Sequence, residues 1–72
     1  MIQEETLTKI IKALKKNGYK VERDGGATVD GCATGIMKIS YKDNSHKYKL
    51  IHEIDLWKVE NLEEVLIEKF NL

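Results

Sequence analysis

The stretch from Ile36 to Ile54 constrains the fold most, because it holds two runs of alternating apolar and polar residues around Asp43-Asn44-Ser45. Alternation is the pattern of half-buried strands. Asp, Asn and Ser favour turns, since their side chains can bond to their own backbone. The stretch therefore predicts a β-hairpin.

Pairing the two runs about Asn44 and Ser45 gathers the apolar residues of the hairpin on one face. That face pairs Tyr41 with Tyr48, Ile39 with Leu50, Met37 with His52, and Gly35 with Ile54. The opposite face pairs Lys42 with Lys47, Ser40 with Lys49, Lys38 with Ile51, and Ile36 with Glu53. A slip of one residue would expose the apolar set, so the pattern favours this register.

The residues before the hairpin predict a helix over residues 4–17 followed by a strand. Leu7, Ile10, Ile11 and Leu14 recur at helical spacing along one side. Asn17-Gly18 ends this helix, because glycine adopts the left-handed cap without steric cost. The strand begins at Tyr19, and alternation turns Tyr19 and Val21 inward.

The residues after the hairpin predict a second helix. Asn61 followed by Glu64 resembles a capping box. The buried stripe of this helix is expected to comprise Leu62, Val65, Leu66 and Phe70, with Ile67 outside it. Trp57, in the link before the helix, either covers the end of the core or serves as an interaction hot spot.

Four glycines crowd residues 24–35, which separate the first strand from the hairpin. Two interpretations stay open there. The segment is either a flexible loop, or two tight turns around a short extended piece, Ala27-Thr28-Val29.

These elements predict one α+β domain over residues 1–72, in the order α-β-β-β-α. A three-stranded antiparallel sheet carries both helices on one face, because only that face of the hairpin is apolar. A chain of 72 residues has room for one core only.

Composition restricts the class of protein further. Cys32 is the one cysteine, so no internal disulfide can form and a reducing compartment fits. No apolar run approaches the roughly 20 residues of a membrane span. We therefore expect a cytoplasmic protein with no membrane partner. The formal net charge is +0, which argues against strong non-specific binding to nucleic acid.

The face of the hairpin opposite the helices is the candidate binding surface. It is expected to carry four lysines and two isoleucines, namely Lys38, Lys42, Lys47, Lys49, Ile36 and Ile51. One interpretation is a docking surface for an acidic partner or a phosphate backbone. Another is a homodimer that buries Ile36 and Ile51. The plainest is an ordinary solvated sheet face.

Catalytic and metal-binding chemistry has weak support in the sequence. A thiol nucleophile would need a histidine close to Cys32, and neither His46 nor His52 is predicted there. No close pair of Cys or His is spaced for a metal. The sequence thus favours a protein that is not an enzyme, with no catalytic residue, cofactor or metal.

The opening of the chain resembles the HicA-type toxins, through Lys16-Asn17-Gly18-Tyr19, Val21, Arg23 and Gly25-Gly26. Those toxins are small ribonucleases with a fold like the double-stranded-RNA-binding domain, and the resemblance implies that fold here. Their catalytic histidine follows a Gly-Ser pair, whereas Ala27 and Thr28 follow Gly26 in this chain. RNA-binding domains of this shape also place lysines at the start of the last helix, where this chain has Glu63 and Glu64.

We therefore expect an interaction or regulatory protein that binds a protein partner. Small phage-encoded inhibitors of bacterial defence share this order of elements, so a phage or another mobile element is an expected source. The alternative is a nucleic-acid-binding or HicA-like ribonuclease module that uses the same lysines with Lys20 and Arg23.

Overall fold

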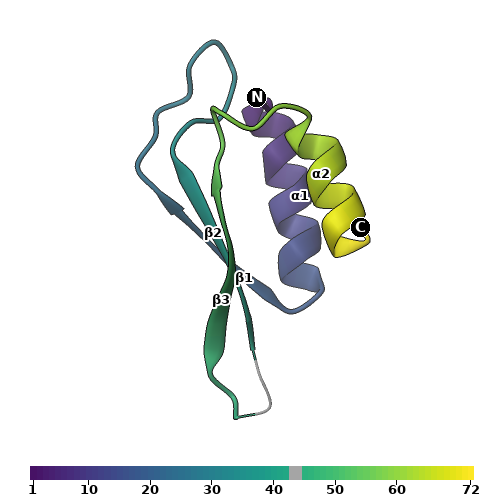
Figure 1. Cartoon of the computed structure of the whole chain (residues 1–72). Coiled ribbons are helices and arrows are strands. Elements are labelled where there is room, and N and C mark those ends of the chain that lie inside the picture. The colour runs from purple at the N-terminus through teal and green to yellow at the C-terminus, as the bar shows by residue number, and fades with distance from the viewer. Residues whose placement is uncertain (43–44) are drawn as a thin grey trace.

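The computed structural model of the chain describes residues 1–42 and 45–72. Within these ranges the chain forms two helices and three strands (Figure 1), namely α1 (Glu4–Lys16), β1 (Tyr19–Asp24), β2 (Ile36–Lys42), β3 (Tyr48–Asp55) and α2 (Leu62–Phe70). The strands form an antiparallel sheet in the order β1-β2-β3. This order confirms the predicted α-β-β-β-α arrangement. Of the predicted turn over residues 43–45, residues 43–44 lie outside the described residues.

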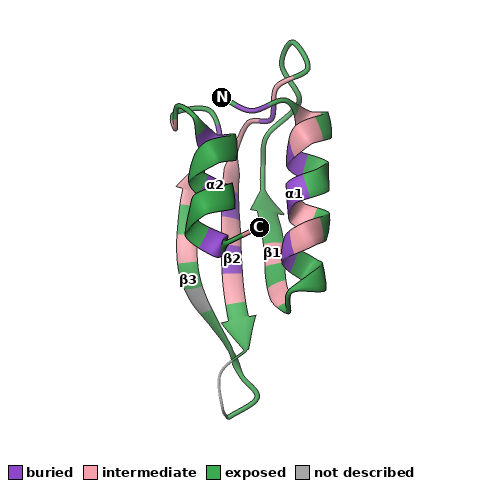
Figure 2. Ribbon diagram, turned by 90° about the vertical axis from the view of Figure 1, so that its right-hand side faces the viewer, coloured by how far each residue is buried: buried purple, intermediate pink, exposed green. Residues whose placement is uncertain are grey.

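Both helices lie on the same face of the sheet, as predicted (Figures 1 and 2). Figure 2 shows α1 beside β1, and α2 in front of the other two strands. The core lies between the two layers. Its buried apolar side chains are Ile2, Leu7, Ile10, Leu14, Ala33, Met37, Ile39, Leu56, Leu62, Leu66 and Phe70.

The ends of α1 confirm the sequence prediction, whereas the start of α2 corrects it. Gly18 follows α1 with φ +89°, the left-handed conformation that glycine adopts without strain. Asn61 precedes α2, but its φ is +54° and its side chain makes no capping hydrogen bond among the described atoms. The predicted capping box with Glu64 is therefore wrong, because the left-handed backbone of Asn61 departs from the extended conformation that this motif uses.

The register of the hairpin is wrong in the sequence prediction. Met37 pairs with Ile54 and Ile39 pairs with His52, two residues from the predicted partners. A register shift between Ile39 and Ser40 then offsets the rest of the hairpin, so that Tyr41 pairs with Lys49. A β-bulge accounts for this offset, because it adds one residue to one strand of a pair. Beyond it Tyr48 and Lys49 face the opposite side from the one predicted.

The segment between β1 and β2 contains a tight turn at Asp30-Gly31, so the second predicted alternative is confirmed only for the turn that follows Ala27-Thr28-Val29. Both residues have positive φ, +50° and +78°, as a two-residue hairpin turn requires. Val29 and Cys32 exchange backbone hydrogen bonds of 3.0 and 2.8 Å across the turn. The carbonyl of Gly31 also accepts a hydrogen bond from the amide of Glu4, 2.8 Å away, so the turn is joined to the start of α1.

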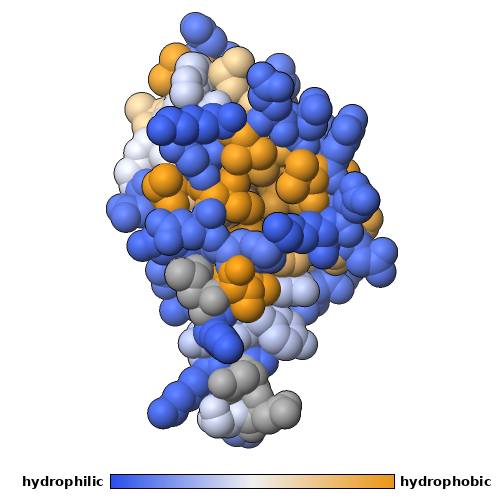
Figure 3. Space-filling view, in the orientation of Figure 1, coloured by the Kyte–Doolittle hydropathy of each residue, from blue (hydrophilic) through white to orange (hydrophobic). Residues whose placement is uncertain are grey.

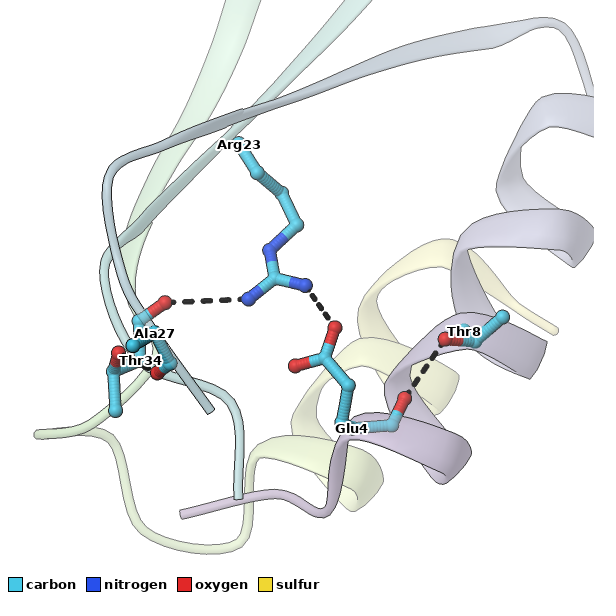
Figure 4. A network of polar contacts seen from close by, with 5 residues as sticks. All are labelled: Glu4, Thr8, Arg23, Ala27 and Thr34. Atoms are coloured by element: carbon cyan, nitrogen blue, oxygen red, sulfur yellow. Dashed lines mark hydrogen bonds and ion pairs between the residues drawn. The ribbon is translucent and has the colours of Figure 1, made fainter. Parts of the chain in front are cut away.

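Arg23 holds the same segment against α1 (Figure 4). Its guanidinium pairs with the carboxylate of Glu4 and donates a 3.3 Å hydrogen bond to the carbonyl of Thr34. The Thr34 hydroxyl in turn donates to the carbonyl of Ala27. This network assigns Arg23 a structural role.

The β2–β3 hairpin extends past the ends of both helices (Figure 1), in a molecule whose principal extents are 41 × 23 × 17 Å. We call the part of the hairpin around Tyr41, Lys42 and residues 45–49 the arm. No described helix is long and apolar enough to cross a membrane.

Candidate protein-binding surface

One face of the sheet carries no helix, as Figure 2 shows, and we call it the open face. Met37 and Ile39 are fully buried on the helix side, so alternation along β2 places Ile36, Lys38, Ser40 and Lys42 on the open face. The cross-strand partners of these residues share the face. On β1 and β3 they are Lys20, Glu22 and Asp24, and Tyr48, Glu53 and Asp55.

Acidic residues surround Lys38 at one end of the open face. Lys38 pairs with Glu22 on β1 and with Glu53 on β3, and its Nζ lies 3.9 Å from a carboxylate oxygen of Asp24. Ile36, half-buried at the same end, lies between Asp24 and Asp55. This end of the face is therefore acidic, and the neighbouring carboxylates offset the positive charge of Lys38.

The end nearer the arm is basic and aromatic. Tyr48 is 53% exposed, and Lys42 is its cross-strand partner. The Nζ of Lys20 lies 5.4 Å from the centroid of the Tyr48 ring, within the range of a cation–π contact. The Nζ of Lys20 also lies 3.2 Å from a carboxylate oxygen of Glu22, which offsets part of the positive charge of Lys20.

Two of the predicted site lysines occupy other places than the sequence suggested. Lys47 precedes β3, and Tyr48 takes the predicted position opposite Lys42, so the predicted pairing of Lys42 with Lys47 is wrong. Lys49 pairs with Tyr41. Tyr41 lies two residues after the buried Ile39 on β2, so alternation places Tyr41 and its partner Lys49 on the helix side. The predicted pairing of Ser40 with Lys49 is thus also wrong, because the bulge reverses which side of the sheet these residues face.

The two predicted isoleucines lie apart. Ile36 pairs with Asp55 and not with Glu53, and Lys38 pairs with Glu53 and not with Ile51. Ile51 lies at the bulge and is 40% exposed. The open face thus joins Lys38, Lys42 and Ile36. The sequence prediction missed Tyr48 there, because its register turned that ring toward the helices.

On the helix side, aromatic rings contact one another in tilted and edge-on arrangements where α2 ends. Tyr19 lies 5.0 Å from Tyr41 and 5.1 Å from Phe70 between ring centroids. His52 meets the edge of Phe70 at 5.3 Å. Partial burial, together with the positive charge of Lys69, lowers the pKa of His52 below its usual value. The prediction that His52 points inward is confirmed.

The residues considered for thiol chemistry do not form a site. Cys32 is half-buried in the tight turn between β1 and β2, whereas His46 lies on the arm at the opposite end of the molecule (Figure 1). His52 faces Phe70. Among the residues that the structure describes, no group of three His, Cys, Asp or Glu side chains could hold a metal ion.

A second surface lies on the side of the molecule formed by β3 and α2, and we call it the β3–α2 side. Figure 3 shows an apolar area there, ringed by hydrophilic residues. Ile51 on β3 and Val65 on α2 are 40% and 38% exposed, so the prediction that Val65 is buried is wrong. Val65, Glu68 and Lys69 line a shallow groove along this flank of α2.

The link before α2 adds one exposed aromatic residue. Asp55 accepts hydrogen bonds from the amides of Trp57 and Lys58, at 3.1 and 3.2 Å, which turns the chain there. Leu56 enters the core at 0% exposure, and Trp57 stays 43% exposed. Trp57 therefore does not close the core.

No family model, curated protein or solved structure matches this chain. The resemblance to HicA-type toxins therefore stays a prediction.

Proposed function

We propose that this chain is a small, non-enzymatic interaction protein that regulates or inhibits a protein partner by binding an acidic surface at its open face. One observation carries the proposal, namely the exposed Tyr48 ring between Lys20 and Lys42. A tyrosine offers a large apolar surface at a small entropic cost, and it is enriched among interface hot spots. The two lysines would attract carboxylates to its rim.

The acidic end of the same face supports a protein partner. Glu22, Glu53 and Asp24 surround Lys38, so the positive charge does not continue along the face. A uniformly charged phosphate backbone would be repelled at that end. A protein surface can match a basic end with carboxylates and an acidic end with lysines, which orients the partner.

Nucleic acid is the second candidate, and the same tyrosine supports it. An exposed ring flanked by lysines can stack a base while the lysines contact phosphates. Binding of this kind weakens with salt by about one log unit of slope per phosphate contact.

The test compares affinity capture by wild-type chain with capture by two pairs of single variants. Tyr48→Ala and Lys42→Glu should each abolish capture of a protein partner. The matched controls are Tyr41→Ala, which removes an exposed ring from the helix side, and Lys12→Glu, which reverses a charge at an exposed position of α1. Both controls should capture as wild type does, and capture that survives Tyr48→Ala and Lys42→Glu overturns the proposal.

A parallel titration separates the two candidates. Labelled single- and double-stranded oligonucleotides are titrated with the wild-type chain at low and moderate salt. No binding at low salt is the expected result. Salt-sensitive binding that is lost in Lys42→Glu and kept in Lys12→Glu would replace the protein partner with nucleic acid.

A further inference from the structure

The charges of this chain are separated along its long axis. We call the end of the molecule opposite the arm the far end, and it comprises residues 1–6, 22–38 and 53–64 (Figure 1). Most of the acidic residues that the structure describes lie there, namely Glu4, Glu5, Glu22, Asp24, Asp30, Glu53, Asp55, Glu60, Glu63 and Glu64. The end that carries the arm is rich in lysine, with Lys15 and Lys16 in the last turn of α1 and Lys20, Lys42 and Lys49 on the strands.

The charges that run against this separation are mostly offset by their neighbours. The basic groups of the far end are those of Arg23, Lys38, Lys58 and the N-terminus. Arg23 is paired with Glu4, and acidic side chains surround Lys38. Toward the arm, Lys69 is offset by the adjacent Glu68. The formal net charge of the chain is +0, so two copies do not repel one another as wholes, and their opposite ends attract.

A hollow opens at the far end, between the N-terminal residues and the start of α2, with a volume of about 330 Å³. Glu63 and Glu64 contribute carboxylates to its lining, and Gln3 and Asn61 contribute amides. Gln3 and Asn61 precede the two helices, and neither side chain caps its own helix. Carboxylate and amide oxygens accept hydrogen bonds, so the hollow fits side chains that bring a positive charge or a donor group.

We propose that the arm of one copy docks into the hollow at the far end of a second copy, so that the chain associates head to tail. The arm projects past the ends of both helices (Figure 1), and it presents Lys42 beside the exposed ring of Tyr48. The ammonium of Lys42 and the hydroxyl of Tyr48 are donors, and the carboxylates of Glu63 and Glu64 accept from them. A second copy is the occupant because its arm supplies the charge and the donors that this hollow accepts.

The two surfaces that meet in this contact differ, so the contact is heterologous. Each added copy leaves one arm and one far end uncovered, and the assembly therefore continues past the dimer. The attraction is between exposed charges, which salt screens over about 8 Å at physiological ionic strength. Self-association is thus weak and sensitive to salt.

The inference rests on the proposed function, because it uses the same arm, and it adds a regulation of that site. An arm that is docked on a second copy cannot bind another protein through Tyr48. Self-association and partner binding therefore compete, and dilution or a more strongly acidic partner frees the arm by mass action.

The first test measures molar mass by sedimentation from low micromolar to millimolar concentration. At low salt the average mass of wild type should rise past that of a dimer, and at about 0.5 M salt it should return toward the monomer. Wild type that stays monomeric at low salt, or whose mass stops at the dimer, overturns the proposal.

Glu64→Lys and Glu68→Lys form a matched pair, because they make the same change at exposed positions one turn apart on α2. Glu64→Lys should weaken self-association about tenfold or more, since it sets a lysine in the hollow against the basic arm. Glu68→Lys, toward the arm, should associate at least as strongly as wild type. Circular dichroism checks that both variants are folded, and equal losses in the two overturn the proposal.

Mixing two neutral double variants tests the head-to-tail arrangement itself. Lys42→Gln with Tyr48→Ala disables the arm, and Glu63→Ala with Glu64→Ala disables the far end. Each variant alone should be monomeric. Their equimolar mixture should form a one-to-one dimer and nothing larger, because one working arm and one working far end remain. A mixture that stays monomeric overturns the proposal.

The variant with Glu63→Ala and Glu64→Ala also separates this inference from the proposed function, because its arm is intact. It should capture a protein partner at least as well as wild type, since its arms are not docked on other copies. Capture through Tyr48 without any self-association of wild type overturns the inference alone. Capture that survives Tyr48→Ala overturns the proposed function.

Discussion

Lys20 on β1 reaches across β2 to place its Nζ 5.4 Å from the ring centroid of Tyr48 on β3. This contact joins both outer strands of the sheet on its open face, and it lies beside Lys42. Exposed cation–π contacts are worth about 0.5–1 kcal/mol, so this contact contributes little to stability.

A double-mutant cycle between Lys20 and Tyr48 tests this contact. Lys20→Gln and Tyr48→Leu should show a coupling energy of about 0.5–1 kcal/mol in urea unfolding. A coupling above about 2 kcal/mol would show that the pair stabilises the fold, and would remove the argument that Tyr48 is kept exposed for a partner.

Gly26 and Gly35 should tolerate no side chain. A Cβ on Gly26 would overlap the carbonyl of Thr34, and one on Gly35 would lie 2.8 Å from the carbonyl oxygen of Gly25. Both residues also have positive φ. Alanine at either position should cost about 2–4 kcal/mol in the free energy of unfolding, from backbone strain and overpacking together.

Gly31→Ala is the control for those two variants, because Gly31 has φ +78° and no atom within 4 Å of the added Cβ. Only the left-handed conformation is penalised there, at about 1–2 kcal/mol. Thermal unfolding of the three variants should therefore rank Gly31→Ala as the most stable. Equal losses would contradict the close approach of the backbone at Gly26 and Gly35.

His52 should make stability depend on pH. Its pKa is lowered in the folded state, by partial burial first and by Lys69 second, so the unfolded chain binds the proton more readily. The contribution of His52 is present above the unfolded pKa of about 6.5 and is lost as the pH falls through and below that value. The melting temperature should therefore fall between pH 7.5 and pH 5.5.

Two variants isolate that effect. His52→Phe should flatten the fall, because it keeps the edge contact with Phe70 in apolar form and removes the proton site. His46→Gln, on the exposed arm, should leave it unchanged. A fall that persists in full in His52→Phe would assign the pH dependence to other groups.

Neighbouring apolar residues of α2 should differ sharply in their contribution to stability. Leu66 is fully buried, and Leu66→Ala should cost about 2–5 kcal/mol. Val65 is 38% exposed, and Val65→Ala should change stability by about 0.5 kcal/mol or less. Urea unfolding measures both losses. A large loss for Val65→Ala would place this side chain in the core.

The sequence by itself determined which segments are helices and strands, because those signals are local. Leu7, Ile10 and Leu14 at helical spacing mark the buried side of α1, and Gly18 marks its end. The apolar alternation of β2 likewise placed Met37 and Ile39 inward. Such patterns depend on a residue and its near neighbours, so no knowledge of distant contacts is needed.

Only the tertiary structure decided the register of the hairpin and the make-up of the open face. Alternation has a period of two. Where β2 pairs from Ile36 to Ile39, the register differs from the prediction by two residues, so the side chains there stay on their predicted faces. The bulge beside Ile39 adds one residue, and one residue is enough to turn Tyr48 from the core to the open face. Packing against α1 and α2 favours the arrangement that buries Met37 and Ile39, and the arm beyond the helices is free of that constraint.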